Sequence, residues 1–254
     1  MPAPGRVRIG LSGWSYPAWK ETFYAGVKRA DWLTHASRRF PTLEVNGTFY
    51  REQKAATLQR WRQATPEDFV FAIKGHRFVT HRLRLADAED ALVRQRENAR
   101  HLLPKLAAVL WQLPPGLKAD PGRLGAFLAA LADWSETRHA IEFRHESWFT
   151  GETERTLEDA GAANCISDAA AWPRWDAVTA PLVYLRLHGR PETYVSAYGR
   201  AALETWAARI ADWRRAGRDV LAYFDNDAAG AAFVDAARLI DLCRGPTRQD
   251  RRRS

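Results

Sequence analysis

The chain has 254 residues, 46% of them hydrophobic, which is enough for one large α/β barrel or two modest domains. Its formal net charge of +8 favours anionic partners, and its two cysteines, Cys165 and Cys243, exclude a disulfide-stapled secreted scaffold. No run reaches the roughly 18 apolar residues of a membrane-spanning helix, and no apolar signal core opens the sequence. We therefore expect a cytoplasmic protein.

Segments with strand character alternate with amphipathic helical segments along the chain. Strands are expected at residues 8–14, 42–46, 69–74, 107–113, within 140–148, and at 163–168, 182–188 and 219–224. Helices are expected at residues 31–39, 54–63, 87–103, 121–134, 153–160, 201–216 and 228–243. Such alternation predicts parallel strands joined by right-handed crossovers.

Eight strands in about 250 residues fit a single (β/α)8 TIM-type barrel better than an open sheet. No glycine-rich fingerprint follows the first strand, which argues against a dinucleotide-binding sheet. We expect one domain over residues 1–246. Residues 247–254 carry four arginines and one aspartate, and we expect a disordered basic tail there.

Polar residues gather where the predicted strands end, which in such a barrel is the mouth that holds active sites. Side chains alternate along a strand, so Glu142 shares a face with Arg144, as do Glu44 with Asn46 and Arg186 with His188. Further polar strand-end residues are Lys74, Gln112, Asp168 and Asn226. We expect these groups to converge on one pocket, although structural ion pairs would explain the same residues.

The residue types indicate an anion site with general acid/base chemistry. Guanidinium groups bind phosphate and carboxylate in a bidentate manner, so Arg144 and Arg186 with Lys74 would hold an anion. Glu142 and His188 are the acid and base candidates, oriented by Glu44 and Asp168. Asn46, Gln112 and Asn226 would add hydrogen bonds to the substrate.

Aromatic and basic residues follow several strands on the mouth side and would form a rim. Those expected to contact a ligand are Trp14, Tyr50, His81, Trp148 and Tyr198. Aromatic rings over a basic surface can stack on nucleic-acid bases or sugar rings. A single-stranded nucleic-acid-binding protein is therefore an alternative function, and loop aromatics that cap the barrel would explain the same residues.

No cofactor is predicted, although a divalent metal is a further alternative. Glu44, Glu142, Asp168 and His188 are possible ligands, but the sequence has no His-Glu-x-x-His motif or paired-histidine spacing. Neither a Gly-x-Ser-x-Gly nucleophile elbow nor a phosphate-binding P-loop is present.

Several short motifs together resemble the YecE-like family, also called domain of unknown function 72. They are GLSGWSY at 10–16, EVNGTFY at 44–50, FAIK at 71–74, Thr80-His81, QLPP at 112–115, EFRHESW at 142–148 and RLHG at 186–189. The similarity extends from Arg8 to about Leu242, and Gly47 stands where related sequences commonly have serine. The resemblance implies a single TIM-type barrel.

A relationship to endonuclease-like barrels has been suggested for this family, which would imply metal-assisted phosphodiester hydrolysis. Those barrels hold several zinc ions with many histidines and carboxylates, a set that this sequence lacks. Our first expectation is thus an enzyme, a hydrolase or lyase without obligatory cofactor, that acts on an anionic small molecule.

Overall fold

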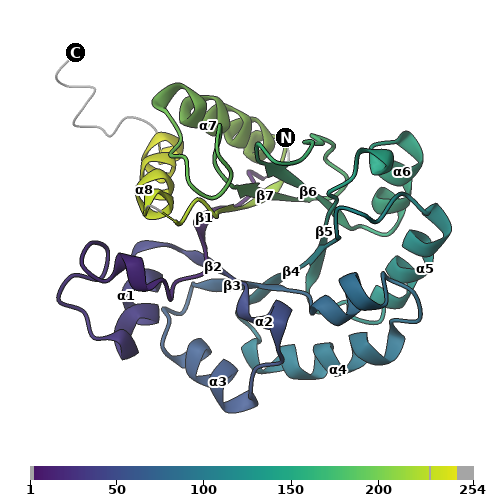
Figure 1. Ribbon diagram of the computed structural model, residues 1–254, viewed down its shortest axis with the longest axis horizontal. Coiled ribbons are helices and arrows are strands. Elements are labelled where there is room, and N and C mark those ends of the chain that lie inside the picture. The colour runs from purple at the N-terminus through teal and green to yellow at the C-terminus, as the bar shows by residue number, and fades with distance from the viewer. Residues whose placement is uncertain (1–2, 229, 245–254) are drawn as a thin grey trace.

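The computed structural model describes residues 3–228 and 230–244, and these form a closed barrel of eight parallel strands inside a ring of helices (Figure 1). Each strand pairs with its neighbours in the sequence, and β1 pairs with β8 to close the barrel. The strands are β1 Val7–Ser12, β2 Thr42–Val45, β3 Val70–Lys74, β4 Leu106–Gln112, β5 Arg138–Glu142, β6 Ala163–Asp168, β7 Leu182–Leu187 and β8 Asp219–Phe224. The predicted TIM-type barrel is confirmed.

Helices cover the outside of the barrel between most successive strands. They are α1 Trp32–Arg39, α2 Gly47–Tyr50, α3 Ala55–Gln63, α4 Glu89–Ala99, α5 Pro121–Leu131, α6 Gly151–Asp159, α7 Arg200–Arg215 and α8 Ala231–Arg244. Residues 169–181, all of them described, join β6 to β7 without a helix. None of the helices in the described part of the chain is both long and apolar enough to cross a membrane.

The observed elements differ from the predicted ones mainly in two short helices and in helix ends. Residues 47–50 form the single turn α2, and Phe78–Arg82 forms a π-helical turn inside the segment expected as a loop. Both are too short to leave a periodic apolar pattern. The last helix begins at Ala231 rather than at residue 228, and the predicted basic tail at 247–254 lies outside the described residues.

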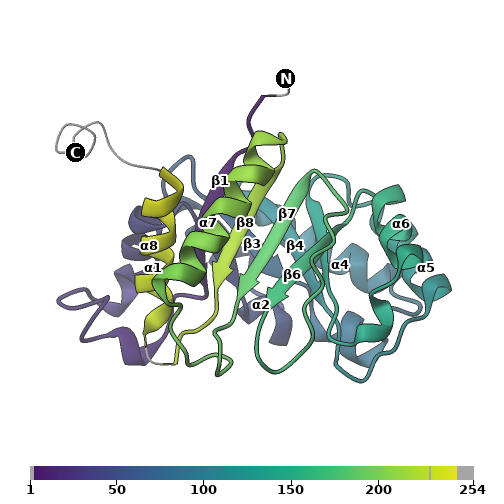
Figure 2. The same cartoon turned by 90° about the horizontal axis from the view of Figure 1, so that it is seen from above.

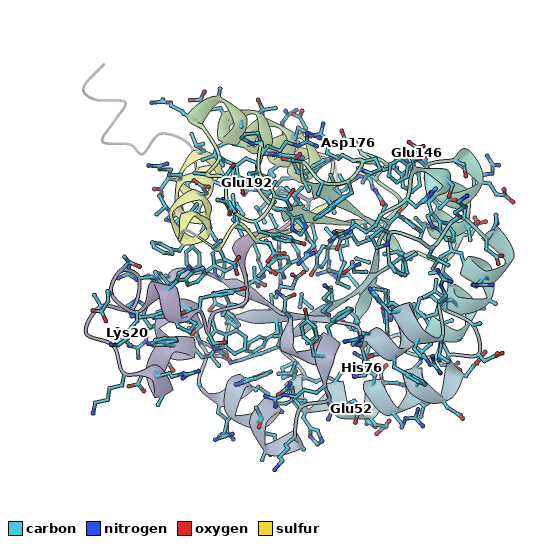
Figure 3. The ribbon with its side chains drawn as sticks, viewed as in Figure 1. Lys20, Glu52, His76, Glu146, Asp176 and Glu192 are labelled. Carbon is cyan, nitrogen blue, oxygen red and sulfur yellow. The ribbon has the colours of Figure 1, made fainter. Side chains whose placement is uncertain are left out.

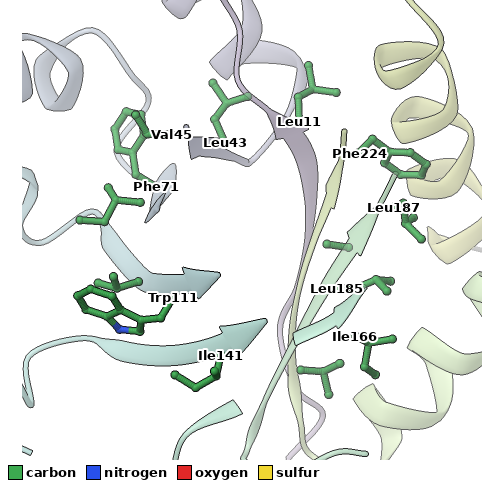
Figure 4. Packing of buried hydrophobic residues seen from close by; sticks show 14 of the residues in the cluster. Leu11, Leu43, Val45, Phe71, Trp111, Ile141, Ile166, Leu185, Leu187 and Phe224 are labelled. Carbon is green, nitrogen blue, oxygen red and sulfur yellow. The ribbon is translucent and has the colours of Figure 1, made fainter. Parts of the chain in front are cut away.

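Outward-facing strand residues form the main hydrophobic core between barrel and helices (Figure 4). Leu43 and Val45 of β2 and Leu185 and Leu187 of β7 pack on this side and are 2% exposed or less. The residues between them, Glu44 and Arg186, must then face the barrel interior. Apolar packing on the outside thus fixes which polar side chains point inward.

The interior of the barrel is narrow and filled, in part because small residues let the strands approach. A Cβ added to Gly10 would lie 1.8 Å from the carbonyl oxygen of Thr42 on β2, so only glycine fits there. At the same level of the barrel, the hydroxyls of Thr42 and Tyr223 are 2.8 Å apart. The visible strand arrows in Figure 2 all point to one end of the barrel. The polar strand ends therefore share one mouth.

Candidate functional site

The loops that follow the strands surround a centre crowded with polar side chains (Figure 3). The labelled residues mark this ring, because Lys20, Glu52, His76, Glu146, Asp176 and Glu192 each lie in a segment that follows a different strand. Four of the expected catalytic or anion-binding residues, Glu44, Glu142, Arg186 and His188, meet inside it and are at most 1% exposed.

Arg186 of β7 is the hub of this cluster. Its Nη2 donates to Oε1 of Glu44 at 2.7 Å, to Oδ2 of Asp225 at 2.8 Å and to Oγ of Ser12 at 3.1 Å. Its Nη1 donates to Oε2 of Glu142 at 3.0 Å. Burial opposes the charge, but the three carboxylates outweigh burial and hold the pKa of Arg186 well above its usual range.

Glu142 ends β5 and binds two guanidinium groups. Its Oε1 accepts from Nε of Arg144 and from the Ser167 hydroxyl, each at 2.8 Å. Nη2 of Arg144 lies 2.6 Å from the same oxygen and completes the ion pair. Burial alone would raise the pKa of Glu142, but Arg144 and Arg186 overcome it and hold the pKa well below its usual range. Glu142 is therefore a carboxylate at neutral pH, which suits it to orienting cations and not to donating a proton.

His188 follows β7 and lies between two carboxylates. Its Nε2 is 3.3 Å from Nη1 of Arg186 and 3.7 Å from Oε1 of Glu142. Its Nδ1 is 3.1 Å from Oδ2 of Asp225, but outside hydrogen-bond alignment. Burial opposes ionisation of Asp225, yet Arg186 and His188 lower its pKa. A small rotation of the ring would give an aspartate–histidine pair.

Besides Arg186, two hydroxyl groups hold the carboxylate of Glu44. Oε2 accepts from the Tyr184 hydroxyl at 2.6 Å, and Oε1 accepts from the Ser12 hydroxyl at 2.5 Å. Nδ2 of Asn46 donates to the same Ser12 oxygen at 2.9 Å. Every oxygen of Glu44 is engaged, so this carboxylate is fixed in place and positions Arg186 and Ser12.

Among the described residues, Lys74 at the end of β3 is the cation of the site that lacks a carboxylate partner. Its Nζ lies 4.3 Å from the ring centroid of Phe49, and no carboxylate oxygen of the described residues is within 4.0 Å of it. The side chain keeps some exposure to solvent. Burial, helped by repulsion from Arg186, lowers the pKa of Lys74 to about 8. A bound anion would stabilise the charged form of such a mostly buried ammonium.

Arg144 and a cover of aromatic residues complete the mouth. The guanidinium carbon of Arg144 lies 3.4 Å from the ring centroid of Trp172, in the helix-free β6–β7 loop. The same indole meets His188 edge-on at 4.9 Å, and Tyr194 meets His188 at 5.5 Å. Nε1 of Trp172 donates to Ser167. These rings cover His188, while Arg144 remains 9% exposed.

Two expected strand-end residues lie outside the cluster. Asp168 faces away from the interior and accepts from Nε of Arg190 at 2.7 Å and from the Tyr198 hydroxyl at 3.0 Å. Asn226 is fully buried and donates to Asp235 on α8 at 2.9 Å. The structure places both in links between strands and outer elements, so Asp168 does not orient Glu142 or His188 by direct contact.

The predicted rim of aromatics is only partly assembled. Trp148 has no exposed surface, and its indole donates to the carbonyl oxygen of Leu117, so it belongs to the core. Tyr198 is likewise buried, at 4% exposure. Trp14 is partly exposed and meets Trp61 edge-on, and Tyr50 is 66% exposed. These rings do not form one stacking platform.

Two further expected residues lie beside the cluster. Gln112 is level with Glu142 on the neighbouring strand, is 9% exposed, and donates to the Leu113 carbonyl oxygen. His81 is partly exposed, meets Phe49 edge-on at 5.1 Å, and contacts Thr80. Burial and the charge of Lys74 lower the pKa of His81. His81 is therefore neutral at physiological pH beside the free ammonium.

Four site residues were not assigned from the sequence. Asp225 and Ser167 stand next to the predicted Asn226 and Asp168, one position earlier in the chain. Strand alternation could have found them, because Asp225 follows Tyr223 by two residues and Ser167 follows Cys165 by two, and both of these face inward. Ser12 and Tyr184 are uncharged, so their residue types did not indicate a role in an anion site.

The described parts of the chain offer no ligand set for the metal site that was considered as an alternative. No three histidine, cysteine or acidic residues among them are placed to hold one ion. The acidic groups that converge at the mouth surround the guanidinium of Arg186. The guanidinium of Arg186 therefore occupies the space between these carboxylates.

The chain is similar to two curated bacterial proteins and to a solved structure. YunF of Bacillus subtilis, named a UPF0759 protein, is 25% identical over 93% of this chain and 94% of its own. YecE of Escherichia coli, also a UPF0759 protein, is 31% identical over 59% of this chain and 53% of its own. A crystal structure of a DUF72 family protein from Thermotoga maritima is 25% identical and superimposes with a TM-score of 0.85 over 94% of this chain and 99% of that one.

The family described as "Protein of unknown function DUF72" matches residues 8–253, which is nearly the whole sequence. The closed barrel agrees with the structure from Thermotoga maritima. The chain therefore belongs to the DUF72 family of TIM-barrel proteins.

Proposed function

We propose that the barrel mouth is an active site for a small anionic substrate that carries a phosphate or carboxylate group. The observation that carries this proposal is Lys74, a mostly buried ammonium to which the described part of the chain offers no carboxylate partner. The other charges of the neighbouring cluster are paired. A substrate anion would supply the missing partner.

Arg144 would bind the same anion. Its Nε and Nη2 are engaged by Glu142, and Trp172 stacks on its plane, so the guanidinium is held rigidly while part of it stays exposed. A preorganised guanidinium loses little entropy on binding and can meet two oxygens at once. Lys74 and Arg144 would thus flank the substrate anion.

Proton transfer would fall to Lys74 and His188 and not to Glu142. Lys74, with a pKa of about 8, can act as an acid near neutral pH, whereas Glu142 is held ionised. His188 lies beneath the cover of Trp172 and would reach substrate when that loop moves. Glu142, Glu44 and Asp225 would position the cations and the imidazole.

The test is a turnover screen. Purified wild-type protein is incubated with a panel of sugar phosphates, phosphodiesters and hydroxy acids, and products are followed by mass spectrometry. We expect turnover of a compound of one of these classes, with a loss of at least tenfold in Lys74→Gln and in Arg144→Gln. Lys118→Gln, which replaces an exposed lysine in the loop after β4, is the matched control. Equal turnover in Lys74→Gln and wild type would remove Lys74 from the site.

A further inference from the structure

A second basic site lies at the opposite end of the barrel, where the strands begin. A groove of about 910 Å3 is lined there by the start of β1, the ends of α1 and α8, and residues before β3. Figure 2 shows that β1 begins and α8 ends at the end away from the strand arrowheads. The groove is thus separated from the mouth by the filled barrel.

In the described part of the chain, six arginines line this groove, against a single acidic residue, Asp68. They come from four different elements or their flanks and are Arg6, Arg8, Arg38, Arg39, Arg214 and Arg244. Residues 245–254, which follow Arg244 directly, contain four more arginines in the sequence. The described lining of the groove is therefore strongly basic.

The guanidinium groups of the groove are largely uncommitted. Among the described residues, no carboxylate oxygen lies within 4.0 Å of a guanidinium nitrogen of Arg6, Arg38, Arg39 or Arg214, and none of these four side chains donates a hydrogen bond. All four are exposed. Nη1 of Arg8 donates to the main-chain carbonyl oxygen of Asp68 and does not pair with the Asp68 carboxylate. Clustered cations without partners produce a positive potential that attracts polyanions.

The helix dipole explains only part of this pattern. Arg38 and Arg39 end α1, Arg214 lies near the end of α7, and Arg244 ends α8, where cations are favoured by about 0.3–1 kcal/mol each. That preference acts at each helix end separately, whereas a common polyanionic ligand would favour arginines from several helix ends in one shared groove.

We propose that this groove binds the phosphodiester backbone of nucleic acid. Arginine matches phosphate geometry, and several cations in one groove fit a ligand with regularly spaced phosphates. Phe40 and Phe69, the aromatic residues of the lining, are at most 3% exposed and offer no face for base stacking. Binding is therefore independent of base sequence and separate from the chemistry at the mouth.

The experiment measures fluorescence anisotropy of labelled, mixed-sequence 20-nucleotide single strands of DNA and RNA at salt concentrations between about 50 and 200 mM, the range over which phosphate contacts are weakened strongly. We expect both strands to bind with similar affinity. The double variants Arg38→Gln/Arg39→Gln and Arg6→Gln/Arg214→Gln should each weaken binding at least tenfold. Each should also reduce the slope of log affinity against log salt by about one to two.

The control is Arg94→Gln/Arg155→Gln, which removes the same charge from exposed helix positions outside the groove. This double variant should bind like wild type. An equal loss in the control, or no binding at the lowest salt, would overturn the proposal. So would binding of the groove to phosphatidylserine vesicles or free pyrophosphate without binding to either oligonucleotide.

Discussion

Nη2 of Arg186 lies 2.7 Å from Oε1 of Glu44, although 142 positions separate the two residues in the chain. This pair, with Glu142 and Asp225 around the same guanidinium, ties β2, β5 and β8 to β7. The cluster at the mouth is therefore a structural joint as well as the candidate site.

Removal of the hub should be costly. Arg186→Met leaves three buried carboxylates without their shared cation, and breaking a buried ion pair in this way costs about 3–5 kcal/mol. Urea unfolding measures the loss. Arg200→Met, which breaks an exposed pair with Glu204, should cost far less, because solvent screens that pair. A stability loss no larger than that of Arg200→Met would show that the network contributes little.

Acid should weaken the same network. The pKa values of Glu142 and Asp225 are lowered in the folded protein, so their stabilisation is complete above the ordinary carboxyl pKa of about 4. It is lost as the pH falls from there through the lower folded values. The free energy of unfolding between pH 7 and pH 3 should fall less steeply in Asp225→Asn than in wild type. Equal slopes would contradict this.

Lys74 should titrate near pH 8. In protein whose lysines carry 13C-methyl groups, the resonance missing from Lys74→Gln should show its midpoint there, because burial and Arg186 disfavour the ammonium. Lys74 is charged below this midpoint, so anion binding should weaken as the pH rises above it. Added phosphate should move the midpoint upward. A midpoint near the ordinary lysine value of about 10.4, unmoved by phosphate, would contradict the assignment.

Two glycine variants test the packing of the barrel. Gly10→Ala places a Cβ 1.8 Å from the Thr42 carbonyl oxygen, so strand β1 must move and the barrel should be strongly destabilised. Gly125→Ala in α5 meets no atom within 4 Å and should raise the free energy of unfolding by about 0.4–1 kcal/mol. Thermal or urea unfolding of both variants checks the contrast.

The barrel was predictable because eight strand patterns alternate with amphipathic helices, and the family motifs point the same way. The placement of Glu44, Glu142, Arg186 and His188 at one mouth also follows, since alternation puts each opposite an apolar neighbour. Which carboxylate meets which guanidinium was not predictable, because it depends on the stagger between strands that are far apart in sequence.

The errors have equally physical causes. Asp168 and Asn226 lie one position beyond the inward-facing Ser167 and Asp225, so a shift of one residue in assigned register moved both to the wrong face. The position of Trp148 depends on how its loop folds back onto Leu117. Such a contact between loops has no periodic signal in the sequence.

The most direct measurement of the central claim is the thermal stability of wild type, Lys74→Gln and Lys118→Gln with increasing sodium phosphate, at constant ionic strength maintained with chloride. A ligand that binds only the folded protein raises stability with the logarithm of its concentration. Phosphate should raise the unfolding temperature of wild type and Lys118→Gln and should lose this effect in Lys74→Gln. Equal stabilisation of all three proteins, or of none, would contradict an anion site at the barrel mouth.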